Sequence, residues 1–296
     1  MAKKITFRKN ERKVIAFSGG SDSVYLALKF GNPKKDVLVH INHNIRKTAK
    51  RDEEFAVSFA KRYGFKVIVL QVFPKFATEE ECRDLRYEAL IKTAKELKVK
   101  QILTGHNLND TIETTIFNMF RGTSINGLSG IGNIIRDGIE IFRPIGQVTK
   151  TEIKCHLISV GQEWVEDETN QANDYTRNEI RNELIPVIRN IFPNFEQTFN
   201  KTITSLNETN DYIEKRSESH IKKIRQANNE LYLPYSLLTE DNIVIGRVLS
   251  KCFDMLGVGR KSVNRENMLL LINGLKDNSE VNIGQLRLNG LFVKKV

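Results

Sequence analysis

The sequence has few cysteines, and they are not grouped. Only three occur in 296 residues, Cys82, Cys155 and Cys252, and no two of them form a CxxC pair. An odd number of widely spaced cysteines favours neither a disulfide framework nor a cysteine-rich zinc or iron–sulfur site. The simplest setting for such a chain is a reducing cytosol, so we expect a cytoplasmic protein.

Long apolar runs are also missing. No stretch approaches the roughly 20 apolar residues of a membrane-spanning helix. The N-terminal MAKKITFRKNERK carries positive charge but lacks the apolar segment of a signal peptide. We therefore expect no membrane partner. The sequence also contains no internal repeat and no low-complexity tract.

Acidic residues are fewer than basic ones. Lys and Arg total 46 against 36 Asp and Glu, which gives a net charge of +10. An excess of positive charge attracts polyanionic partners, although it does not determine the fold. Nucleic acid is the partner class that this balance favours.

The pattern of apolar residues predicts a parallel sheet covered by helices. Between residues 12 and 105, short β-branched runs alternate with stretches of helical period, as in α/β folds. The predicted strands are Lys13–Phe17, Asp36–Asn42, Lys66–Gln71 and Lys100–Thr104. The predicted helices are Asp22–Phe30, Thr48–Tyr63, Glu79–Leu97 and Leu108–Phe120. The fold class is α/β, with a doubly wound, mostly parallel, Rossmann-like sheet.

The rest of the first domain, residues 1–193, is expected to be less regular. Five glycines in Gly122–Gly138 are too many for a helix interior, so this segment is predicted to be an irregular loop over the edge of the sheet. Helices are expected at Lys150–Val160 and Tyr175–Arg189.

Two further parts are expected after this domain. Residues 194–228 are polar with a helical pattern, which predicts a helical connector. Residues 229–296 are predicted to form a small α+β module with helices near Glu240–Leu256 and Val263–Leu275. The dipeptide Asn289-Gly290 between two short alternating runs predicts a β-hairpin.

The stretch KVIAFSGGSDS places a glycine pair where the first predicted strand ends and a helix begins. Backbone N–H groups and the positive helix end can converge there on an anion such as phosphate. The turn lacks the lysine of a Walker A loop and does not fit GxGxxG. The hydroxyls of Ser18, Ser21 and Ser23 can bind phosphate, and Asp22 can hold Mg²⁺ beside it. The alternative is an ordinary turn with a Ser or Asp N-cap.

A second motif, LTGHNLNDTIETT, follows the fourth predicted strand. Asp110 and Glu113 lie four and seven positions after His106, so all three share one face of the next helix. The carboxyl ends of parallel strands border the ligand crevice, so this face should look towards the glycine turn. Such a group could bind Mg²⁺ and orient a nucleophile. The alternative is an acidic helix start that complements the helix dipole.

Basic residues recur in three further motifs. In HINHNIR, His40 and His43 would point to opposite faces of a strand, which argues against a shared zinc ion, whereas Arg46 can meet anionic groups. The other two motifs, RDLRYEAL and YTRNEIRNELIP, each place a pair of arginines one helical turn apart. Such pairs are usually solvated basic faces, but they also suit phosphate contacts.

Together these motifs resemble the PP-loop ATP pyrophosphatases and are most similar to the tRNA(Ile)-lysidine synthetase family. The resemblance covers roughly residues 12–190. It rests on the order and spacing of SGGSDS, HINHNIR, RDLRY, GHNLNDTIET, GLSGI, RPI before TKTEI, and DETN before YTRNEIRNELIP. It implies a nucleotide-binding domain followed by smaller tRNA-binding parts.

The resemblance implies a ligase that joins free L-lysine to the 2-oxo carbon of the wobble cytidine in the CAU anticodon of tRNA(Ile). ATP would first adenylate this base with release of pyrophosphate, and the lysine amine would then displace AMP. The product, lysidine, pairs with adenosine and switches decoding from AUG to AUA. The sequence leaves open whether the chain forms a homodimer.

The resemblance also implies roles for individual residues. Those implied to bind ATP are Ser18, Gly19, Gly20, Ser21, Asp22 and Ser23, with Mg²⁺ held by Asp22 and Asp110. The implied catalytic residues are Asp110, Glu113, His106, Arg83 and Arg86. Further candidates for substrate or tRNA contacts are His43, Arg46, Arg121, Arg177 and Arg181. The sequence departs from many relatives at Asn109, where they carry an acid.

Two other classes of function are compatible with a PP-loop domain. One is a different PP-loop reaction, such as tRNA cytidine thiolation or nucleotide amidation. Thiolating relatives usually have grouped cysteines and amidating relatives an ammonia-generating domain, neither of which this sequence shows. The other is a basic RNA-binding protein that has kept the fold and lost catalysis.

Overall fold

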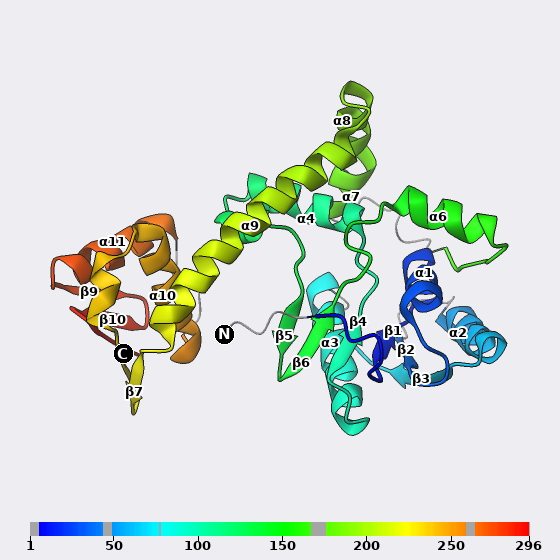
Figure 1. Cartoon of the computed structure of the whole chain (residues 1–296), viewed down its shortest axis with the longest axis horizontal. Coiled ribbons are helices and arrows are strands. Elements are labelled where there is room, and N and C mark those ends of the chain that lie inside the picture. Colours follow the sequence, from blue (N-terminus) through cyan, green and yellow to red (C-terminus); the bar gives the residue numbers. More distant parts are fainter. Residues whose placement is uncertain (1–5, 44–48, 77, 167–175, 259–263, 296) are drawn as a thin grey trace. The chain divides into compact units, whose positions relative to one another are not determined.

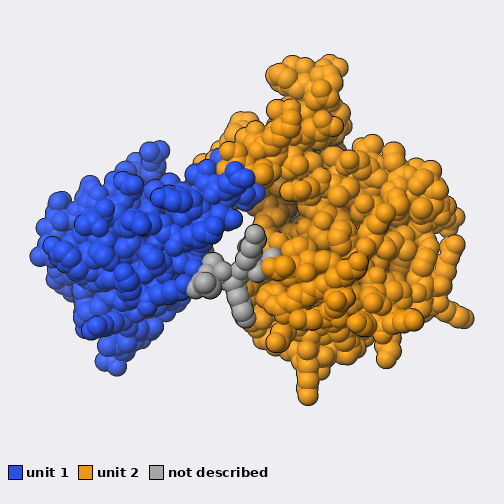
Figure 2. Space-filling model, viewed as in Figure 1, with its two compact units in different colours: residues 1–3, 206–296 blue, residues 4–205 orange. Residues whose placement is uncertain are grey.

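The computed structural model describes residues 6–43, 49–76, 78–166, 176–258 and 264–295. The chain divides into two compact units (Figure 2): residues 4–205 form the larger, and residues 206–296 form most of the smaller. Helix α9 (Phe195–Ile221) crosses this division. The functional boundaries expected at residues 193 and 228 stay predictions.

The larger unit is built on a six-stranded sheet with the order β3-β2-β1-β4-β6-β5 (Figure 1). Its strands are β1 (Val14–Ala16), β2 (Val37–Asn42), β3 (Lys66–Gln71), β4 (Gln101–Leu103), β5 (Ile134–Arg136) and β6 (Ile139–Phe142). All pairings are parallel except that of β5 with β6 at the edge. The strand order reverses between β1 and β4, which is where open α/β sheets bind ligands.

The central strands are apolar on both faces. Val14 and Ile102 face one core, whereas their neighbours Ile15 and Leu103 face the other. Such continuous apolarity is typical of parallel strands that are covered on both sides. The predicted doubly wound α/β fold is confirmed.

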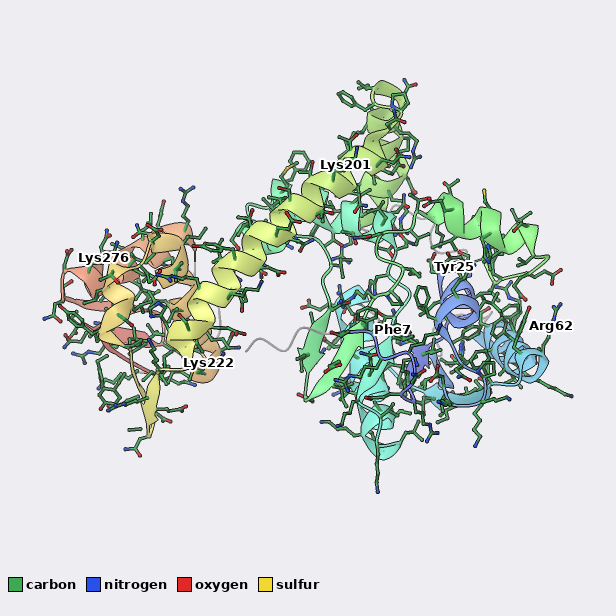
Figure 3. All side chains as sticks on the ribbon, in the orientation of Figure 1. Phe7, Tyr25, Arg62, Lys201, Lys222 and Lys276 are labelled. Carbon is green, nitrogen blue, oxygen red and sulfur yellow. The ribbon has the colours of Figure 1, made fainter. Side chains whose placement is uncertain are left out.

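Helices cover both faces of this sheet (Figure 1). Helix α3 (Glu79–Glu96) packs on one face. Helices α1 (Ser21–Phe30), α2 (Ala49–Tyr63) and α6 (Lys150–Ser159) pack on the other. The ring of Tyr25 on α1, labelled in Figure 3, meets that of His156 on α6 edge-on, with 5.3 Å between the ring centroids.

Helix α4 (Leu108–Phe120) belongs to a separate apolar cluster. It packs against a helical segment made of α7 (Thr176–Glu179), a π-helical turn (Ile180–Leu184) and α8 (Ile185–Ile191). π-Helical turns are frequent at functional sites. The segment continues through Pro186 and ends at Ile191, two residues beyond the predicted end at Arg189.

The expectation of an irregular loop over Gly122–Gly138 was wrong in part. The segment contains a short helix, α5 (Ile125–Leu128), and strand β5. The sequence also missed β6, which forms a hairpin with β5 through Asp137 and Gly138. Both turn residues have positive φ, 52° and 79°, a conformation that Asp-Gly pairs adopt readily.

The smaller unit combines the end of α9 with helices and a sheet. The helices are α10 (Asn242–Met255) and α11 (Arg265–Lys276), preceded by a 3₁₀ turn (Tyr235–Thr239). The five antiparallel strands, in sheet order, are β7 (Arg225–Ala227), β8 (Glu230–Tyr232), β11 (Phe292–Lys295), β10 (Leu286–Asn289) and β9 (Glu280–Ile283). The predicted α+β module and its hairpin at Asn289-Gly290 are confirmed. No helix among the described residues could cross a membrane.

A buried ion pair fixes the start of β1. The side chain of Lys13 is fully buried, and its Nζ lies 3.4 Å from Oδ2 of Asp36. The same ammonium donates to the carbonyl of Glu11 at 2.8 Å. Asp36 also accepts the backbone N–H groups of Lys13 and Asn32, so it joins the N-terminal segment to the turn before β2.

We expect Asp36→Ala to lower the free energy of unfolding of the larger unit by about 3–5 kcal/mol, because it leaves a buried ammonium unpaired. Urea unfolding followed by fluorescence of the only tryptophan, Trp164, reports on this unit. Asp84→Ala, which removes the exposed pair with Arg136, is the control and should cost less than about 1 kcal/mol. Equal losses in the two variants would contradict a structural role for the buried pair.

Candidate nucleotide-binding site

The glycine turn folds around the hydroxyl of Ser23. This Oγ accepts the N–H of Ser18 at 3.2 Å and that of Gly19 at 3.1 Å, and donates to the carbonyl of Gly20 at 2.9 Å. Gly19 has φ +89°, which disfavours a side chain there. Helix α1 begins at Ser21 without a side-chain cap, so its first N–H groups are available to an anion.

A glycine that the sequence prediction did not single out, Gly105, brings the two motifs together. It lies two residues after the end of β4, and a Cβ built on it would lie 3.3 Å from backbone atoms of Asp22 and Ser23. The end of β4 therefore contacts the start of α1. A glycine immediately after a predicted strand was the available signal.

Asp110 lies at the start of α4, where it forms a capping box with Asn107. Its Oδ2 accepts the N–H of Asn107 at 2.9 Å, while the Asn107 Oδ1 accepts the N–H of Asp110 at 3.0 Å. Burial raises the pKa of Asp110 to about 7, and the negative charges of Asp22 and Glu113 add to this effect. Asp22 and Asp110, predicted to face each other, thus interact electrostatically.

Glu113 is bound by an arginine from the π-helical turn. Arg181 donates from Nε and Nη2 to the two Glu113 oxygens, at 2.7 and 2.6 Å, and its Nη2 also lies 3.7 Å from Oδ1 of Asp110. The Glu113 side chain is only 6% exposed, so this two-pronged contact compensates a buried charge. Arg181 was predicted as a candidate for substrate or tRNA contacts, which stays a prediction; in the structure it binds the acidic face of α4.

Lys150, the first residue of α6, supplies a cation at the glycine turn. Its Nζ lies 2.6 Å from Oδ2 of Asp22, and its backbone N–H donates to Oδ1 of Asn109 at 2.8 Å. The sequence prediction missed this residue, although TKTEI had been noted as a motif. The amide of Asn109, at the position where many relatives carry an acid, thus anchors the start of α6.

Asp22 and Asp110 fit the magnesium ion that was predicted. The second oxygen of Asp22, Oδ1, is buried without a hydrogen-bond partner, and carboxylate oxygens are the ligands that Mg²⁺ prefers. Within the described residues, no group of three or more His, Cys, Asp or Glu could hold a metal. The remaining ligands would have to be water and nucleotide phosphates, as is usual for Mg²⁺.

Arginines surround His106. Burial lowers the pKa of His106 to about 3, assisted by the positive charges of Arg143, Arg83, Arg86 and Arg177. The imidazole is therefore neutral, and its Nδ1 lies 3.1 Å from the hydroxyl of Thr104. Three of these arginines were predicted. Arg143, from the RPI motif, was not, and its buried guanidinium donates to the hydroxyl of Tyr87 at 3.2 Å.

The remaining candidates are less central. The guanidinium groups of Arg121 and Arg177 lie over the ring of Phe117 on α4, at 5.0 and 5.5 Å. His43 is half-buried just after β2. Arg46 falls outside the described residues, so its role stays a prediction.

A Rossmann-like sheet with SGGSDS after its first strand and an acidic helix start after β4 defines a nucleotide-binding domain of the PP-loop class. A family model described as the PP-loop domain matches residues 1–188. The chain belongs to this family.

Relatives of known name match most of the chain. A tRNA(Ile)-lysidine synthase of Clostridioides difficile is 32% identical over 293 residues, 93% of this chain and 63% of the relative. That of Persephonella marina is 32% identical over 252 residues, 81% and 54% of the two chains. The chain thus spans between half and two thirds of these relatives. A U34-tRNA thiolase from Methanococcus maripaludis, 15% identical with a TM-score of 0.57 over 68% of this chain and 73% of its own, shares the fold.

The raised pKa of Asp110 predicts a pH-dependent stability. The unfolded chain ionises this carboxyl near pH 4, whereas the folded chain retains its proton up to about pH 7. Stability from this group is therefore lost as the pH rises through that window. Asp110→Asn stays neutral and can still accept the N–H of Asn107, so it should be about 1–3 kcal/mol more stable than the wild type at pH 8, but not at pH 4.

Urea unfolding followed by Trp164 fluorescence at several pH values measures this difference. Glu152→Gln is the matched control of opposite sign, because the hydroxyl of Thr149 lowers the pKa of Glu152. That variant should be less stable than the wild type at pH 8, and the deficit should vanish in acid. If Asp110→Asn is less stable than the wild type at pH 8, the pKa of Asp110 is not raised in the folded protein.

Proposed function

We propose that this protein ligates lysine to the 2-oxo carbon of the wobble cytidine in tRNA(Ile) with a CAU anticodon, using ATP and forming lysidine, AMP and pyrophosphate. The observation that carries the proposal is the electrostatic interaction of Asp22 with Asp110, which follow the two strands between which the strand order of a PP-loop domain reverses. The similarity to two tRNA(Ile)-lysidine synthases supports the choice of substrate.

The first step is adenylation of the cytidine. Its 2-oxo oxygen attacks the α-phosphorus of ATP, the bond to the bridging oxygen breaks, and pyrophosphate leaves with the electron pair. A neutral pyrimidine oxygen is a poor nucleophile, so alignment and charge neutralisation must provide most of the rate enhancement. The first N–H groups of α1 would bind the phosphates, and Mg²⁺ held by Asp22 and Asp110 would screen their charge.

The second step is attack of the lysine amine on the activated carbon, with AMP as the leaving group. The amine, with a pKa of about 10.4 in water, must lose a proton. Asp110 would be the better acceptor of the two nearby acids when it holds no Mg²⁺, because its pKa is then about 7 whereas both oxygens of Glu113 accept from Arg181. Glu113 with Arg181 would keep the acidic face of α4 in place.

The arginines near His106 would contact the RNA. Arg83, Arg86 and Arg177 place positive charge beside a neutral imidazole at the end of β4. Phosphates close to the reacting base are the groups that such a cluster suits. The smaller unit and the net charge of +10 would serve tRNA binding outside the crevice.

Thiolation is less well supported. Cys82 is half-buried, Cys155 is exposed and Cys252 lies in the apolar core of the smaller unit. The three lie on separate helices, α3, α6 and α10, without the CxxC spacing that favours a metal or redox site. The likeness to a tRNA thiolase concerns the fold.

The test is transfer of labelled lysine to unmodified tRNA(Ile) carrying a CAU anticodon, with ATP and Mg²⁺. We expect transfer by the full chain and a loss of at least about 100-fold in Asp110→Ala, which removes a proton acceptor and a metal ligand. Asp84→Ala is the control on an exposed acid. Methionine tRNA with the same anticodon should accept no label. The proposal would be wrong if the full chain transferred no lysine and instead catalysed ATP–pyrophosphate exchange with another acceptor.

A further inference from the structure

The glycine turn contains no lysine, yet a lysine reaches it from a distant part of the chain. Lys150 lies 128 residues after Asp22, and its Nζ is 2.6 Å from Oδ2 of that residue. The Lys150 side chain is 42% exposed, so a ligand bound at the start of α1 can reach the ammonium. This places a positive charge beside the start of α1, where phosphate would bind.

The backbone of Lys150 is fixed by two elements. Its N–H donates to the Asn109 side chain at the start of α4. The preceding residue, Thr149, caps α6 through a capping box with Glu152. The position of the Cα is therefore set by α4 and α6 together, while the side chain can exchange one anionic partner for another.

We propose that Lys150 is a catalytic residue that binds the β- and γ-phosphates of ATP and neutralises the departing pyrophosphate. This inference rests on the ATP-binding part of the proposed function. When the bond between the α-phosphorus and the bridging oxygen breaks, the electron pair and the negative charge pass to pyrophosphate. The ammonium of Lys150 stabilises this charge without giving up a proton.

Neighbouring cations are less suited to this role. Arg181 uses two nitrogens to bind Glu113, which is buried and would be left uncompensated. The positive charges of three other arginines, Arg83, Arg86 and Arg177, lower the pKa of His106, which follows β4. The Lys150 contact with Asp22 is partly exposed, so opening it costs little.

The test is calorimetric binding of pyrophosphate and of AMP to the full chain, each with Mg²⁺. Lys150→Ala should weaken pyrophosphate binding about tenfold or more, because a charge-assisted contact is lost, and should leave AMP binding within about twofold. Lys150→Arg should recover part of the loss. Lys154→Ala is the matched control, since Lys154 lies one turn further along α6 and pairs with Glu166 at 2.8 Å. It should bind both ligands like the wild type.

Three outcomes would overturn the inference: unchanged pyrophosphate binding in Lys150→Ala, equal weakening of pyrophosphate and AMP, or no pyrophosphate binding by the wild type. Equal weakening would mean that Lys150 only maintains the shape of the site. Unfolding followed by Trp164 fluorescence checks that each variant is folded. If the wild type binds pyrophosphate through Lys150 but transfers no lysine to tRNA, the proposed function fails and the role of Lys150 stands.

Discussion

The site at the carboxyl ends of β1 and β4 depends on cations that compensate three neighbouring acidic groups. Asp22, Asp110 and Glu113 come from the starts of two helices that the parallel sheet directs to the same edge. Their repulsion and burial are balanced by cations from later in the chain. Lys150 contacts Asp22, and Arg181 contacts Glu113 and Asp110. The segments after β6 thus complete a site whose acids lie in the first 113 residues.

This division of labour explains several details of the larger unit. Gly105 permits the close approach of β4 to α1. The π-helical turn carries Arg181 while its neighbour Ile180 packs in the apolar cluster of α4. Asn109 is neutral where many relatives carry an acid, and its side chain accepts the backbone N–H of Lys150. Each of these features contacts or carries a residue of the candidate site.

The sequence predicted the parts of this structure that follow from local pattern. Four strands, their helices and the positions of Asp22, Asp110 and Glu113 follow from periodicity and the rule for strand ends. The partners of these acids could not be predicted, because the contact of Lys150 with Asp22 spans 128 residues and no local signal encodes it. Strands β5 and β6 were missed because glycine content outweighed the Asp137-Gly138 turn signal.

The contact of Lys150 with Asp22 has a consequence for turnover. In the resting protein each group already has a partner, so a bound phosphate must displace one carboxylate from the ammonium. In the proposed role of Lys150, the carboxylate would act as a weak internal competitor for the ammonium, because the contact is partly exposed. If pyrophosphate is the leaving group, as proposed, this competition would favour its release, because a lysine without a carboxylate partner would hold pyrophosphate longer.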